Sequence, residues 1–165
     1  MIQTPLKWIA WFVVCFLLQT TVISSISIMG VKPDLLILVL FLFAVKNGVL
    51  PATYVGFILG LAQDIYTPGI LGQNALAKTI IGSFAGLFNE KTVRVDPIFQ
   101  IVLLVIVFLL NDTVDMVVLT LKSGGSFITI FTHMFTATLP RALYSLVFAA
   151  VPFIWQNYIQ PASRR

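Results

Sequence analysis

Apolar residues dominate the chain in long runs, which short polar or turn-forming stretches separate. Runs 8–28 and 97–121 exceed twenty residues. At about 1.5 Å per residue, each can cross a hydrocarbon core of roughly 30 Å. The pattern predicts six apolar helices, at residues 8–28, 33–45, 49–65, 74–89, 97–121 and 128–158. We therefore expect an all-α, polytopic integral membrane protein with a single transmembrane domain over residues 1–165.

The second apolar run is unusually short. A helix over 33–45 rises only about 20 Å, less than the hydrocarbon thickness. Lys46, Asn47 and Gly48 follow it directly, and Pro51 argues against one unbroken helix through both runs. We expect runs two and three to form a tight hairpin, with the short arm buried against neighbours or incompletely crossing. Five crossings, with one re-entrant segment, is the alternative.

Composition and charge agree with a lipid environment. Hydrophobic residues make up 59% of the chain and charged residues 10%, too few to coat a globule that faces water on all sides. The net charge of +4 comes from scattered lysines and arginines, which argues against a nucleic-acid surface. With six crossings and the N-terminus inside, the outer side carries only Lys32 and Lys122. The cytoplasmic side carries Lys7, Lys46, Lys91, Arg94, Arg164 and Arg165. This asymmetry predicts an N-in, C-in orientation.

Six ionisable residues lie within or at the ends of the predicted helices, where each would cost several kcal/mol if it faced lipid. They are Asp64, Lys78, Asp112, Asp115, His133 and Arg141. We expect these side chains to face inward and to form three pairs, Asp64 with Lys78, Asp112 with Arg141, and Asp115 with His133. Such pairs would either lock helix packing or line an outward-facing polar cavity, and the sequence leaves both open.

Two pairs of glycines have the spacing that lets helix backbones approach closely. Gly56 and Gly60 lie on the third run, and Gly82 and Gly86 on the fourth. The pattern predicts packing between these consecutive helices. The alternative is a face for a partner or for a second copy of the chain, which would make a homodimer.

Candidate catalytic residues are scarce. The chain has one cysteine, Cys15, and one histidine, His133, and neither G-x-S-x-G nor H-E-x-x-H occurs. An aspartyl dyad needs carboxylates that converge from different elements, whereas Asp112 and Asp115 share one helix. We therefore expect no enzyme activity, no metal site and no cofactor.

The order of several motifs resembles a known family. The sequence first reads Lys-Pro-Asp-Leu-Leu over 32–36 and then Asn47-Gly48. In order along the chain there follow Gly56, Gly60, Leu61, Gln63 and Asp64, then Gly-Ile-Leu-Gly-Gln-Asn-Ala-Leu over 69–76, and finally Gly82 and Gly86. It is similar to MreD, the rod-shape-determining membrane protein. On this resemblance, the residues that would shape the outer hairpin ends are Pro33, Asp34, Gln63, Asp64, Gly72 and Asn74.

The resemblance implies a bacterial inner-membrane component of the cell-elongation machinery for peptidoglycan synthesis. Its partners would be MreC, MreB, RodA and a class B penicillin-binding protein. It also implies a fold similar to the substrate-binding components of energy-coupling-factor transporters. The leading hypothesis is a non-enzymatic scaffold or regulator that binds MreC in the bilayer. The alternative is a membrane protein that binds a small molecule or a lipid-linked precursor.

Overall fold

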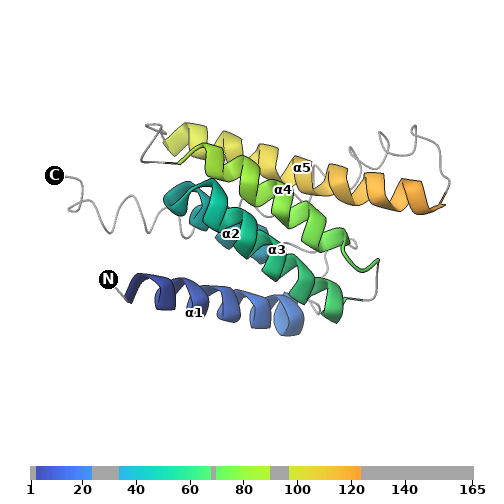
Figure 1. The fold of residues 1–165 in the computed structure, drawn as a ribbon, viewed down its shortest axis with the longest axis horizontal. Coiled ribbons are helices and arrows are strands. Elements are labelled where there is room, and N and C mark those ends of the chain that lie inside the picture. The colour runs from blue at the N-terminus through green and yellow to red at the C-terminus, as the bar shows by residue number, and fades with distance from the viewer. Residues whose placement is uncertain (1–2, 24–33, 68–69, 90–96, 124–165) are drawn as a thin grey trace.

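The computed structural model describes residues 3–23, 34–67, 70–89 and 97–123, the ranges drawn as coloured ribbon in Figure 1. Within these ranges the chain is helical and contains no strand. The elements are α1 (Gln3–Leu18), the π-helical η1 that continues it (Gln19–Ile23), α2 (Leu35–Asn47), α3 (Val49–Tyr66), α4 (Gln73–Leu87) and α5 (Pro97–Ser123). The all-helical class predicted from the sequence is therefore confirmed for the described residues.

The predicted apolar runs correspond closely to the helices. Runs two to five differ from α2–α5 by at most two residues at either end. Helix α1 begins earlier than the first run, at Gln3, while the sixth run, 128–158, lies outside the described residues. Two helical stretches are long and apolar enough to cross a membrane, Val49–Tyr66 and Phe99–Lys122; Lys7–Thr21 and Leu35–Asn47 are apolar but shorter.

A single residue, Gly48, connects α2 to α3. Its φ of 89° lies in the left-handed region, which residues with a Cβ rarely adopt. Its N–H donates to the Ala44 carbonyl at 2.8 Å, and its carbonyl accepts from the Ala52 N–H at 3.3 Å. Pro51 lies in the first turn of α3, where a missing N–H removes no helical hydrogen bond. The tight hairpin predicted from the sequence is present.

Helix α2 lies at the centre of the bundle. It packs against α1, α3, α4 and α5, and Figure 1 shows α1 and α5 on opposite sides of the middle helices. Because neighbours cover it on several faces, α2 can be apolar around its whole circumference. Its buried residues are Leu36, Ile37, Leu38, Val39, Leu40, Phe41, Phe43, Ala44 and Val45.

Helices α3 and α4 make the closest contact in the bundle, and the glycines explain why. Gly56, Gly60, Gly82 and Gly86 all lie where the two backbones meet. A Cβ built on Gly86 would lie 2.6 Å from the Val49 Cα, and one built on Gly60 would collide with the backbone of Asn74 and Ala75. The glycines therefore serve packing within the chain, one of the two roles that their spacing predicts.

We expect Gly60→Val to lower the melting temperature of the purified protein in detergent by about 5 °C or more, because the new side chain must push two backbones apart. Ile65→Ala is the matched control on the same helix, since Ile65 is 79% exposed. Equal melting temperatures for Gly60→Val and the wild type would show that α3 and α4 do not approach so closely.

Candidate functional site

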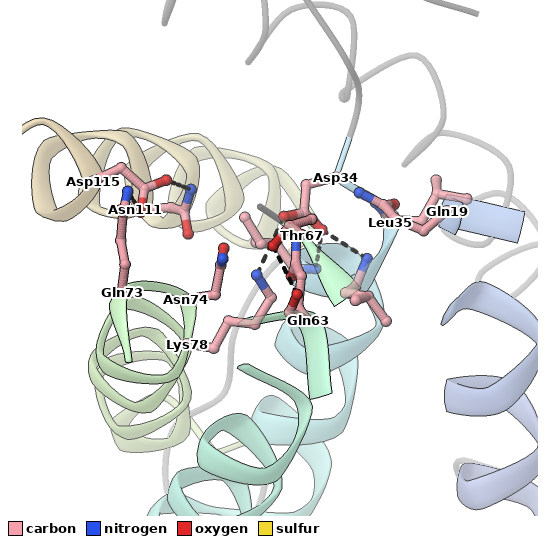
Figure 2. A network of polar contacts seen from close by, with 12 residues as sticks. Gln19, Asp34, Leu35, Gln63, Thr67, Gln73, Asn74, Lys78, Asn111 and Asp115 are labelled. Atoms are coloured by element: carbon pink, nitrogen blue, oxygen red, sulfur yellow. Dashed lines mark hydrogen bonds and ion pairs between the residues drawn. The ribbon is translucent and has the colours of Figure 1, made fainter. Parts of the chain in front are cut away.

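Polar side chains gather at the end of the bundle where α2 and α4 begin and α3 ends. Figure 2 shows them between the helices, joined by hydrogen bonds and one ion pair. We call this set the polar cluster. It consists of Asp34, Gln63, Asp64, Gln73, Asn74, Lys78, Asn111 and Asp115.

Lys78 of α4 is fully buried, and its ammonium group pairs with Asp34, the residue directly before α2. The distance from Lys78 Nζ to Asp34 Oδ2 is 3.3 Å. The other oxygen of Asp34 accepts from the backbone N–H groups of Leu36 and Ile37, at 3.0 and 3.2 Å. Asp34 is thus the N-cap of α2, where a negative charge also complements the helix dipole. One carboxylate both starts α2 and joins it to α4.

The predicted ion pair between Asp64 and Lys78 is wrong. The Asp64 carboxylate on α3 instead accepts hydrogen bonds from backbone N–H groups at the start of α4. The donors are Gly72, Asn74 and Ala75, each at 3.0 Å. The Asn74 side chain adds a fourth hydrogen bond at 2.9 Å. Gly72, the N-cap residue, has no side chain with which to cap the helix. A carboxylate from the neighbouring helix therefore satisfies these donors.

Helix lengths bring two carboxylates to nearly the same level, because Asp34 lies about 21 Å and Asp64 about 24 Å from the Gly48 turn. Lys78 pairs with Asp34 because both oxygens of Asp64 already accept hydrogen bonds from the start of α4. Lys78 lies five residues into α4, about 8 Å from its start, and helical side chains lean toward the N-terminus of their own helix. The ammonium group therefore reaches the level of Asp34.

Hydrogen bonds also connect α4 to α5. Gln73 Nε2 donates to Asp115 Oδ1 at 3.2 Å, and Asn111 Nδ2 donates to Asp115 Oδ2 at 3.1 Å and to Asp112 Oδ1 at 3.3 Å. Asp112 is 5% exposed. The partners predicted for Asp115 and Asp112 were His133 and Arg141, and these two residues lie outside the described residues.

The structure places five of the six family-motif residues at this end of the bundle, and the sixth, Pro33, lies outside the described residues. Asp34, Asp64, Gly72 and Asn74 take part in the hydrogen bonds above. Gln63 contributes differently, because its backbone carbonyl accepts from the Thr67 hydroxyl at 2.7 Å. Its side-chain Oε1 is buried without a hydrogen-bond partner among the described residues.

Three residues that the sequence does not mark as part of the polar site also form hydrogen bonds at this end of the bundle, namely Gln19, Gln73 and Asn111. Gln19 Oε1 accepts from the Leu35 N–H at 2.9 Å, which joins the end of α1 and η1 to the start of α2. Asn111 could have been found, because it lies four residues before Asp115 and shares its helix face. Gln19 and Gln73 carry no comparable signal, since their partners come from other helices.

We expect Lys78→Met to destabilise the protein by about 3 kcal/mol, because it leaves the Asp34 carboxylate, which is only 14% exposed, without its cation. Adding Asp34→Asn should recover part of this loss, since asparagine still caps α2 but carries no charge. Thermal denaturation in detergent measures both effects.

Lys122→Met is the control for this pair, because Lys122 is exposed near the end of α5. If Lys78→Met and Lys122→Met gave the same melting temperature, the buried ion pair would be absent.

The polar cluster thus links α2, α3, α4 and α5 through charge-assisted hydrogen bonds, most of them partly buried. A family model described as the rod shape-determining protein MreD matches residues 2–158, nearly the whole chain. No curated protein and no solved structure matches it. Because the matched region includes every described helix, the family applies to the complete bundle. The chain belongs to the MreD family of bacterial membrane proteins, which take part in rod shape determination.

Proposed function

We propose that this protein is a non-enzymatic scaffold or regulator of the cell-elongation complex and that it binds the single-pass protein MreC within the membrane. The family match over residues 2–158 carries this proposal, because it assigns the chain to rod shape determination. MreB, RodA and a class B penicillin-binding protein would belong to the same complex, which makes peptidoglycan.

The distribution of polar and apolar side chains supports a scaffold role. Asp64, Lys78 and Asp112 are at most 7% exposed, so the bundle keeps these three charged side chains inside. Large apolar side chains face outward instead, including Trp11 on α1 and Ile58 on α3, which are 59% and 64% exposed. An exterior of this kind suits lipid and the transmembrane helix of a partner equally well.

We further propose six membrane crossings with both termini in the cytoplasm, as in the substrate-binding components of energy-coupling-factor transporters. On this view the polar cluster faces outward and the α2–α3 turn faces the cytoplasm. Contacts near that turn support the assignment. The Lys46 ammonium lies 5.9 Å from the centre of the Trp8 ring, a pairing of basic and aromatic residues that suits a cytoplasmic membrane interface.

Cysteine labelling tests this orientation. In a Cys15→Ala background, Thr67→Cys at the end of α3 should react with a membrane-impermeant maleimide on intact spheroplasts. Asn47→Cys at the other end of the hairpin should react only after the membrane is permeabilised. Both positions are exposed and so remain accessible to the reagent. The opposite labelling pattern would show that the proposed orientation is inverted.

Co-purification tests the partner. When the tagged full-length protein is solubilised in mild detergent, we expect it to retain MreC through affinity and size-exclusion steps. A single-pass protein with an unrelated transmembrane helix, expressed at the same level, is the control and should be lost. Absence of MreC, together with retention of a small ligand, would contradict the scaffold proposal and favour a ligand-binding protein.

A further inference from the structure

The side-chain amide of Asn111 has only one orientation that fits its surroundings. Its Nδ2 donates to two carboxylates, Asp115 at 3.1 Å and Asp112 at 3.3 Å. Turning the amide over would place its oxygen against two carboxylate oxygens, which repel it. Both amide hydrogens are therefore committed to the acidic residues, and Oδ1 is left as an acceptor.

Asn111 Oδ1 is buried and has no hydrogen-bond partner among the residues that the structure describes. The whole residue is 5% exposed, so bulk solvent does not satisfy this oxygen. A buried acceptor without a donor destabilises a protein markedly, which is why such atoms are rare. This position therefore calls for a group that donates a hydrogen bond.

The neighbouring charge indicates what kind of donor fits. Both oxygens of Asp115 accept from neutral amides, those of Gln73 and Asn111, and no cation pairs with this carboxylate in the described part of the chain. The buried ammonium of Lys78 donates to Asp34 instead. A positively charged donor would thus satisfy both the orphan amide oxygen and the acidic side chain.

The planar amide of Asn111 holds its Oδ1 close to the Asp115 carboxylate. Nδ2 and Oδ1 lie roughly 2.2 Å apart by standard bond lengths. Asp115 Oδ2 lies 3.1 Å from Nδ2, which keeps this carboxylate oxygen within about 5 Å of Oδ1. Figure 2 shows Asn111 and Asp115 of α5 facing the first turns of α4, next to Gln73 and Asn74. Asp115 is only partly buried, so a group from outside the bundle can reach its carboxylate.

We propose that Asn111 and Asp115, with Gln73 beside them, form a binding site for a primary ammonium group. The ammonium donates N–H bonds to Asn111 Oδ1 and to the remaining lone pairs of Asp115. Two sources offer this chemistry, the headgroup of phosphatidylethanolamine and a free small amine. The site does not depend on the proposed partner, because the residues that form it lie inside the bundle.

Two lipids of equal headgroup charge test the proposal on the full-length protein. Phosphatidylethanolamine carries N–H donors, whereas the quaternary ammonium of phosphatidylcholine has none. Native mass spectrometry of the detergent-solubilised protein, titrated with the dioleoyl form of each lipid, measures both affinities. We expect the wild type to bind phosphatidylethanolamine about tenfold more tightly, the scale of one charge-assisted hydrogen bond in a buried site.

Matched variants assign this preference to the site. Asn111→Leu removes the acceptor and Asp115→Asn removes the charge. Each should therefore make the protein bind the two lipids with about equal affinity. Asn47→Leu makes the first of these chemical changes at the opposite end of the bundle and should leave the preference intact. The comparison of the two lipids on the wild type needs no variant, so equal binding there counts against a headgroup ligand even if a substitution impairs folding.

Free ethanolamine distinguishes the two sources. If ethanolamine does not displace the lipid, the bound ammonium is that of a headgroup. If ethanolamine displaces the lipid, or raises the melting temperature of the wild type but not of Asn111→Leu, the ligand is a soluble amine. Equal binding of both lipids without any effect of ethanolamine overturns the proposal. A phosphatidylethanolamine preference that persists in Asn111→Leu overturns it as well.

Discussion

The buried ion pair between Lys78 and Asp34 is the interaction on which the arrangement of this bundle depends. Hydrocarbon offers no water to a charged side chain, so a lysine inside a membrane helix must find its counter-charge within the protein. Asp34 supplies it and also caps α2, which places the start of α2 beside the second turn of α4. The position of the short helix in the bundle follows from this contact.

The other polar groups obey the same constraint in different ways. Asp64 satisfies the N–H groups at the start of α4, and Asp115 accepts from the amides of Gln73 and Asn111. Because carboxylates and amides bond to each other or to helix ends, the outer surfaces of α1 and α3 can remain apolar. A chain built this way has a polar interior and an apolar exterior that can face lipid, which fits the scaffold role proposed above.

Much of the fold could be predicted from the sequence, because apolar runs and glycines act locally. The limits of α2–α5, the hairpin at Gly48 and the close packing of α3 on α4 all follow from patterns along the chain. The pairing of charges could not be predicted equally well. The spacing along the sequence predicts that Lys78 lies near Asp64. Lys78 pairs with Asp34 instead, because α2 begins at the level of Lys78 and because Asp64 accepts hydrogen bonds from the start of α4.

Magic-angle-spinning NMR of the protein in lipid bilayers tests the central pairing most directly. With ¹⁵N-lysine and ¹³C-aspartate labels, we expect a dipolar contact between the Lys78 ammonium and the Asp34 carboxyl carbon. That contact should disappear from the spectrum in Lys78→Met and should be absent for Asp64. A Lys78 signal coupled to Asp64, or one that contacts only lipid acyl chains, would show that Lys78 does not pair with Asp34.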